Sequence, residues 1–152
     1  MPHSPTTQAP QSVLLASFFV REALCGLDAA GIQEVIRLGP LTPVRHAPEE
    51  VAGIVNLRGK IVTILDLGLR LGFPKIAACG DSRVLILDDR NEFIGLLVDR
   101  VDEVVEVASD QWQPVPPNVS WGQARFFKGV CRAHGRVVTL LDADQILAEV
   151  VP

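Results

Sequence analysis

The stretch GIVNLRGKIVTILDL, residues 53–67, consists of two apolar runs on either side of a short break at Arg58 and Gly59. Two apolar runs separated by two residues that include a glycine are typical of a β-hairpin. We therefore expect a hairpin here, with the arginine at its turn. An arginine in this place either keeps a loop hydrated or presents a fixed charge to a partner.

A second copy of this stretch, GVCRAHGRVVTLLDA, begins 76 residues later and covers residues 129–143. The glycines, the Val-Thr pair and the Leu-Asp pair recur at the same places. Because the repeats keep their order along the chain, we expect two similar five-stranded units with a boundary near residues 74–81. A weaker match, 69 residues apart, relates Gly26-Leu27 and Glu34-Val35 to Gly95-Leu96 and Glu103-Val104.

The spacing of apolar runs predicts an all-β fold. The runs are short, rich in Val, Ile and Leu, and separated by turn signals such as His134-Gly135. Helix is a minor component. We expect Asp66 to cap a short helix over 67–71 and Asp142 to cap a last helix. The segment PEEVAG (48–53) should add one helical turn. The expected strands are 13–20, 33–38, 54–57, 60–66, 83–88, 93–99, 103–107, 126–132 and 136–141, and the last helix should share a face of Ile146, Leu147 and Val150.

Composition favours one compact domain. Apolar residues make up 48% of the 152 residues and charged residues 21%, so we expect a disordered tail over 1–12 and a folded domain over 13–150. The net charge is −4 and no window concentrates Lys or Arg, so no nucleic-acid partner is expected. No run approaches the ~18 apolar residues of a membrane span, so no direct membrane insertion is expected.

The three cysteines, Cys25, Cys79 and Cys131, are odd in number and form no C-x-x-C. This usage favours a reduced, cytosolic protein, and we expect each cysteine to fill space in the core.

The sequence contains no recognisable catalytic or metal-binding motif, so no catalytic residue, metal or cofactor is expected. His46 and His134 lie in separate loops without a neighbour at ligand spacing. The acidic pairs at 88–89 and at 142 and 144 suit a turn and a helix start. Trp112 and Trp121 flank a proline-rich loop, and we expect them to pin it to the core.

Apolar residues next to single carboxylates point to protein docking. Ile32 and Val35 in GIQEVIRL, and Val101 and Val104 in DRVDEVVEV, lie beside such carboxylates. Exposed apolar patches rimmed by charge are typical of docking surfaces. Periodicity alone leaves open the alternative that these valines face the core.

The segments around both hairpins resemble a known family. VAGIVNLRGKIVTILDL, preceded by CGLDAAGIQEVIRL and followed by FIGLLVDRVDEVVEV and FFKGVCRAHGRVVTLLDADQIL, is similar to the CheW family of chemotaxis coupling proteins over about residues 13–150. The resemblance implies two SH3-like five-stranded β-barrels packed on a shared apolar seam, without catalysis. It also implies a cytoplasmic adaptor, at membrane-attached receptor arrays, that joins chemoreceptor cytoplasmic tips to the regulatory domain of a histidine autokinase.

The resemblance assigns partner-binding positions as well. One set lies where the first barrel would meet receptor or kinase, and two valines would line the seam that holds the receptor tip. Because a partly buried arginine needs an anion, we expect Glu34 and Arg58 to be paired. The implied positions are Ile32, Glu34, Val35, Leu41, Gly53 and Arg58 on the first barrel, and Val101 and Val104 in the seam.

The alternative function is a regulatory barrel that senses a small molecule in the seam between its halves. A ligand site needs a few converging polar groups, and the sequence shows no such cluster for the seam. The adaptor is therefore favoured.

Overall fold

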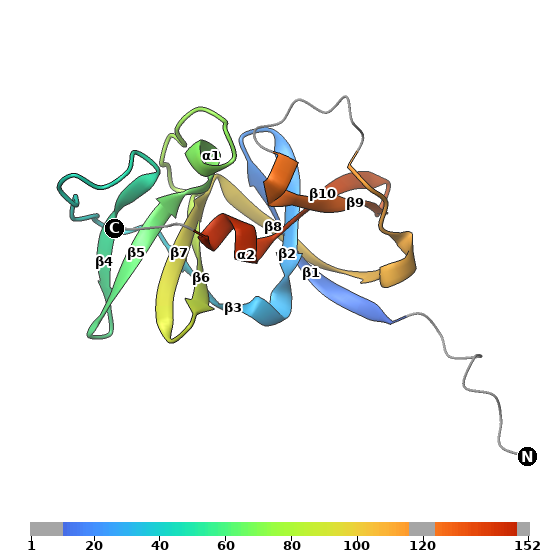
Figure 1. Cartoon of the computed structure of the whole chain (residues 1–152), viewed down its shortest axis with the longest axis horizontal. Coiled ribbons are helices and arrows are strands. Elements are labelled where there is room, and N and C mark those ends of the chain that lie inside the picture. Colours follow the sequence, from blue (N-terminus) through green and yellow to red (C-terminus); the bar gives the residue numbers. More distant parts are fainter. Residues whose placement is uncertain (1–10, 116–123, 149–152) are drawn as a thin grey trace, which may run out of the picture.

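The computed structural model describes residues 11–115 and 124–148, which form ten β-strands and a few short helices (Figure 1). The expected all-β class is confirmed. The apolar runs predicted nine of the strands and missed β2, whose segment ALCGLD is short and contains a glycine. The strands are β1 (Ser12–Val20), β2 (Ala23–Asp28), β3 (Ile32–Arg37), β4 (Val51–Leu57), β5 (Lys60–Asp66), β6 (Arg83–Asp89), β7 (Glu92–Val98), β8 (Arg100–Ala108), β9 (Phe127–Ala133) and β10 (Arg136–Leu141), and the α-helices are α1 (Leu67–Arg70) and α2 (Ala143–Leu147).

The strands form two five-stranded sheets, each curled into an SH3-like barrel. In barrel A the strand order is β8-β1-β2-β10-β9, and in barrel B it is β3-β6-β7-β5-β4. The two orders correspond strand for strand under the internal repeat. Each strand of one barrel has its repeat equivalent at the same place in the other: β8 corresponds to β3, β1 to β6, β2 to β7, β10 to β5 and β9 to β4. The expectation of two similar barrels is therefore confirmed.

The expected boundary near residues 74–81 is wrong. These residues lie between β5 and β6, and both of those strands belong to barrel B. Each barrel takes two strands from one sequence repeat and three from the other. Figure 1 shows the consequence, since the blue strands β1 and β2 lie beside the orange and red strands β9 and β10. The two repeats have exchanged strands within one chain.

The links between strands explain this exchange. A single residue, Asp99, separates β7 from β8, and the tightest common hairpin loop has two residues. The chain therefore runs on from barrel B into barrel A, where β8 pairs with β1. After β2, the 3-10 turn Ala29–Gly31, capped by Asp28, leads the chain from barrel A to barrel B. The predicted boundary assumed that neighbouring strands pair, which is a tendency and not a rule.

One apolar core runs through both barrels. Its buried members include Phe18 of β1, Leu65 of β5, Leu96 of β7 and Ile146 of α2. The barrels therefore share an apolar seam, as the family resemblance implied. A smaller cluster fills barrel A, and Trp112 packs against it.

Two of the three cysteines fill the core as expected. Cys25 and Cys131 are buried, and burial raises the pKa of the Cys25 thiol to about 12. The same prediction is wrong for Cys79, which is exposed. It lies in the turn before β6, where its N–H donates to the hydroxyl of Ser82 at 3.0 Å.

Both short helices begin at the predicted aspartate caps. The Asp66 carboxylate accepts the N–H of Leu69 at 3.0 Å, and the Asp142 carboxylate accepts the N–H of Gln145 at 3.2 Å. The segment PEEVAG forms no turn of helix: the N–H of Val51 donates to the carbonyl of Pro48 in a turn, and β4 begins at Val51. Among the residues that the structure describes, no helix has the length and apolar content to cross a bilayer.

A buried arginine ties the two barrels together. Arg70 ends α1 on barrel B, and its side chain is only 7% exposed. Its guanidinium donates to the carbonyl oxygens of Ile146 at 2.9 Å and Ala148 at 2.5 Å, at the end of the helix that follows barrel A. It also lies 5.0 Å from the ring of Phe126 and 3.4 Å from the carboxylate of Glu50. These partners compensate the cost of burying the charge.

Several predicted features lie outside the described residues. They are residues 1–10 of the tail, Trp121, the prolines at 116 and 117, and Val150 of the last helical face. The first strand begins at Ser12, one residue before its predicted start.

The strand exchange predicts that the two repeats cannot fold separately. In fragments of residues 1–78 and 79–152, β3 is parted from its partner β6, and β8 from its partner β1. We expect each fragment alone to be largely unfolded. An equimolar mixture should recover the native circular dichroism and a dispersed amide NMR spectrum. A dispersed spectrum from either fragment alone would contradict the exchange.

Candidate protein-docking site

Arg58 occupies the first position of a two-residue hairpin turn. The ladder of β4 and β5 ends at the pair Leu57 and Lys60, and φ is 51° at Arg58 and 86° at Gly59, as in a type I′ turn. The side-chain oxygen of Asn56 accepts the N–H of Gly59 at 2.8 Å. A residue with a Cβ costs about 1–2 kcal/mol in this conformation. The turn itself therefore gives no reason for an arginine.

The expected ion pair between Glu34 and Arg58 is confirmed. The Arg58 guanidinium donates a hydrogen bond to Oε1 of Glu34, which lies on β3. The arginine side chain is 69% exposed and the glutamate side chain 33%, so other guanidinium donors face solvent. Exposed pairs contribute about 0–1 kcal/mol to stability. The pair therefore adds little to the stability of the fold.

Val35 adds an exposed apolar side chain to β3, on the side of the strand opposite to Glu34. It follows Glu34 on β3 and is 46% exposed. Ile32, on the same strand, is half-buried and packs against the shared core. Of the predicted positions on β3, Glu34 pairs with Arg58 and Val35 is exposed, whereas Ile32 contributes mainly to packing.

Leu41 and Gly53 meet each other near the start of β4, at the end away from Arg58. A Cβ on Gly53, where φ is +152°, would lie 2.8 Å from the carbonyl oxygen of Thr42 and 3.1 Å from Cβ of Leu41. The glycine is needed because Thr42 and Ile54 exchange two hydrogen bonds of 2.9 Å. Gly53 is buried, so it reaches a partner only through Leu41, which lines a cavity of about 590 Å³.

Val101 and Val104 lie on one outer face of barrel A. In the antiparallel pair of β8 with β1, Val104 is opposite Ala16 and Val101 is opposite Phe18. Opposed residues point to the same side of a sheet. Val101 is 38% exposed and Val104 is 60% exposed, which excludes the alternative that both face the core. Because Phe18 belongs to the shared core, Val101 lies at the edge of the seam.

Leu14 extends this face and was not predicted. It lies on β1 two residues before Ala16, so it points to the same side as Val104, and it is 54% exposed. The run 13–20 is apolar on both faces, so its periodicity gave no signal that one leucine is displayed. We call Leu14, Val104 and Val101 the apolar strip.

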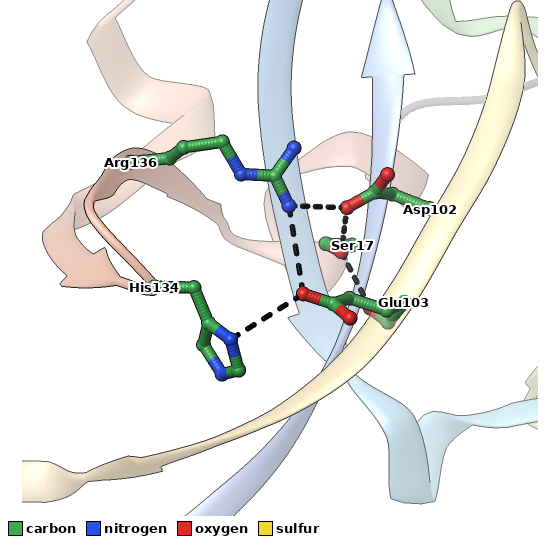
Figure 2. Close-up of polar contacts among 5 residues, drawn as sticks. All are labelled: Ser17, Asp102, Glu103, His134 and Arg136. Atoms are coloured by element: carbon green, nitrogen blue, oxygen red, sulfur yellow. Dashed lines mark hydrogen bonds and ion pairs between the residues drawn. The ribbon is translucent and has the colours of Figure 1, made fainter.

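A polar cluster forms around Asp102 and Glu103, the two residues between Val101 and Val104 on β8 (Figure 2). Arg136 donates to Oδ2 of Asp102 at 2.5 Å and lies 3.6 Å from Oε1 of Glu103, and Nδ1 of His134 lies 3.7 Å from the same Glu103 oxygen. The Ser17 hydroxyl donates to the backbone carbonyl of Glu103 at 2.5 Å. The hydrogen bond from Arg136 lowers the pKa of Asp102 below its ordinary value. The cluster therefore joins β1, β8 and the β9–β10 hairpin.

The internal repeat relates this cluster to the ion pair on barrel B. Glu103 and His134 occupy the positions of Glu34 and Arg58, 69 and 76 residues further along the chain. In both barrels a glutamate on the third strand of the repeat contacts a side chain at a hairpin turn. An exposed valine follows each glutamate. The chain thus carries the same surface arrangement twice, once on each barrel.

The described residues contain no group of three or more His, Cys, Asp or Glu side chains that could hold a metal ion. Carboxylates do converge in a cavity of about 270 Å³ between the barrels, which corrects the expectation that the seam lacks polar groups. Three of them, Asp28, Asp88 and Asp142, accept backbone N–H groups. Asp88 and Asp142 thus have the turn and capping roles that the sequence predicted.

Comparison with known proteins identifies the family. The family model of the CheW-like domain matches residues 15–151, which is nearly the whole chain. The chain belongs to the CheW family. The match includes all the predicted docking positions, from Ile32 to Val104.

Relatives of this CheW-family chain are chemotaxis proteins. The chemotaxis protein CheW of Thermotoga maritima is 31% identical over 134 residues, which cover 88% of this chain and 87% of the relative. The corresponding protein of Rhizobium meliloti is 30% identical over 132 residues, covering 87% and 85%. The crystal structure of the scaffolding protein TtCheW from Thermoanaerobacter tengcongensis matches with a TM-score of 0.79 at 30% identity, covering 87% of this chain and 90% of that one.

The lowered pKa of Asp102 predicts a pH dependence of stability. Because the folded-state pKa lies below the ordinary value of 3.8, the stabilisation is present above that pH and is lost as the pH falls through the folded pKa. Asp102→Asn lacks this contribution. The difference in unfolding free energy between the wild type and Asp102→Asn should therefore shrink from about pH 5 to about pH 2. Chemical denaturation at each pH measures it, and a constant difference would contradict the prediction.

Proposed function

We propose that this chain is a non-catalytic adaptor that couples the cytoplasmic tip of a chemoreceptor to the regulatory domain of a histidine autokinase. It would act in the cytoplasm, at membrane-attached receptor arrays. The observation that carries the proposal is that each barrel exposes apolar side chains on the strand that bears its glutamate, in a chain of the CheW family. An adaptor needs two such surfaces, because both partners must be held at once.

We assign the surface of barrel B to the kinase regulatory domain. Arg58 holds Glu34 with one part of its guanidinium and keeps further donors exposed. A planar guanidinium with free donors suits carboxylates or backbone carbonyls of a folded partner. Val35 supplies an exposed apolar side chain on the strand that carries Glu34, and Gly53 acts indirectly by allowing Leu41 to sit close to β4.

We assign the apolar strip of barrel A to the receptor tip. An amphipathic helix docks by laying apolar side chains, spaced three or four residues apart, along an apolar surface. The strip offers Leu14, Val104 and Val101 in a row that leads to the seam between the barrels. The Glu103 carboxylate beside the strip favours basic residues at the rim of such a helix.

A small-molecule sensor remains the second candidate, and its site would be the cavity of about 270 Å³ between the barrels. Three carboxylates that line this cavity already accept backbone N–H groups of turns or helix starts. They are therefore accounted for without a ligand. The adaptor explains the exposed valines, which a sensor of this kind does not require.

The first test concerns the apolar strip. Val104→Asp places a carboxylate where an apolar helix would lie, so binding of a receptor-tip helical hairpin should weaken by about 2 kcal/mol or more. Val137→Asp is the matched control, because Val137 is 50% exposed on barrel A and is not part of the strip. Isothermal titration of both variants decides the matter. Wild-type affinity in folded Val104→Asp would refute the assignment.

The second test concerns Arg58. Arg58→Glu places a second carboxylate beside Glu34, so we expect affinity for the kinase regulatory domain to fall about tenfold or more, which is about 1.4 kcal/mol. Kinase autophosphorylation in a reconstituted mixture with receptor should fall with it. An ordinary surface residue would change either measurement by less than about 0.5 kcal/mol.

Arg90→Glu is the matched control for this test. Arg90 is also the first residue of a two-residue turn on barrel B, with φ of 54°. The double variant Glu34→Arg with Arg58→Glu restores an ion pair of reversed polarity, and it should regain stability without regaining full coupling. Equal loss in Arg58→Glu and Arg90→Glu would mean that the site is not specific.

A further inference from the structure

We propose that Ser17, Asp102 and Arg136 are positioning residues that fix a β-bulge in β8 and thereby display Val101 and Val104 together. This inference rests on the proposed function, because it assigns the device that shapes the receptor-tip surface. The three residues themselves need not touch the partner.

The bulge follows from the register of β1 and β8. Two residues of β1, Ala16 and Phe18, are two positions apart, but their partners Val104 and Val101 are three positions apart. Asp102 and Glu103 therefore both oppose the single residue between Ala16 and Phe18, which is the residue count of a β-bulge. The ladder continues in register on either side.

Without the bulge the two valines could not share a face. Side chains alternate along a regular strand, so residues three apart point to opposite sides of the sheet. One extra residue between Val101 and Val104 reverses the alternation, and both side chains reach the outer face of barrel A, at 38% and 60% exposed. The apolar strip thus depends on the bulge for its continuity.

The polar cluster holds this bulge from both sides (Figure 2). A bulge leaves a residue outside the regular ladder, and the Ser17 hydroxyl, on a residue only 3% exposed, donates to the carbonyl of Glu103 at 2.5 Å. From the hairpin side, Arg136 binds the other bulge residue, Asp102, at 2.5 Å. The lowered pKa of Asp102 agrees with this contact.

Barrel B provides an independent comparison within the same chain. The register of β3 with β6 also shifts, between Ile32 and Glu34, and Glu34 is held by Arg58 of the neighbouring hairpin. In both barrels an irregular strand is therefore fixed by a cation from the hairpin. In barrel A the turn position holds His134, and Arg136, two residues further on, supplies the permanent charge.

Loss of the cluster should therefore weaken docking without unfolding the domain. Arg136→Gln removes the charge that holds Asp102, and a loosened bulge lets one valine turn away from the strip. Because a less ordered surface must be ordered on binding, we expect affinity for the receptor-tip hairpin to fall about fivefold to tenfold. Affinity for the kinase regulatory domain, which we assign to barrel B, should stay within about twofold of the wild type.

Four further variants separate the effect of the Arg136–Asp102 contact from other effects of the substitution. Arg136→Lys keeps the charge and should recover most of the affinity, whereas Arg132→Gln, on the same hairpin but outside the cluster, should bind as the wild type does. Asp102→Asn should reproduce Arg136→Gln, and the double variant should be no weaker than either single variant, because the two side chains act as one unit. Methyl NMR signals of Val101 and Val104 should shift in Arg136→Gln, and the signal of Val35, on barrel B, should not.

The outcomes separate this inference from the proposed function. Wild-type affinity of Arg136→Gln, together with lost binding by Val104→Asp, would overturn the positioning role alone. Absence of any tip binding by the wild type, or wild-type affinity of Val104→Asp, would overturn the proposed function. If Arg136→Gln does not fold, Ser17→Ala decides in the same way, because it removes only the hydroxyl that holds the Glu103 carbonyl.

Discussion

The pairing of β8 with β1 and of β3 with β6 is the constraint on which the rest of the molecule depends. Each pair joins strands from different sequence repeats, so each barrel exists only because the other repeat completes it. The single residue between β7 and β8 enforces this arrangement, since it leaves no room for a hairpin. The exposed valines Val35, Val101 and Val104 lie on β3 and β8, each of which is the first strand after the chain crosses from one barrel to the other.

The two barrels show how one arrangement has diverged within a single chain. Barrel B carries a glutamate, an exposed valine and an arginine at the hairpin turn. Barrel A keeps the glutamate and the valine, replaces the turn arginine by histidine, and places an arginine two residues later. It also adds Leu14 and Val101 to the exposed apolar area. The surfaces are thus related in framework but differ in shape and charge, which suits the proposal that they dock different partners.

Local features of the sequence predicted local structure well. The hairpin at Arg58 and Gly59, the caps at Asp66 and Asp142, and the internal repeat all depend on residues close in the chain or on identities at a fixed spacing. The pairing of Glu34 with Arg58 came from the family resemblance and is also confirmed. Strand exchange was not predictable in the same way, because apolar runs specify strands but not their partners. The exposure of Leu14 and the bulge at Asp102 and Glu103 depend on register, which no single strand reveals.

The Arg70 contacts, together with the short links between barrels, have a mechanical consequence. The covalent connections between the barrels are one residue and three residues long, and the guanidinium fastens the end of α2 to barrel B. These connections are too short to let one barrel rotate as a separate body against the other. A load applied between two bound partners would be carried by the backbone and by ladders of hydrogen bonds acting side by side. The domain is therefore a stiff spacer, and its own dimensions would set the distance between two proteins bound to its two barrels.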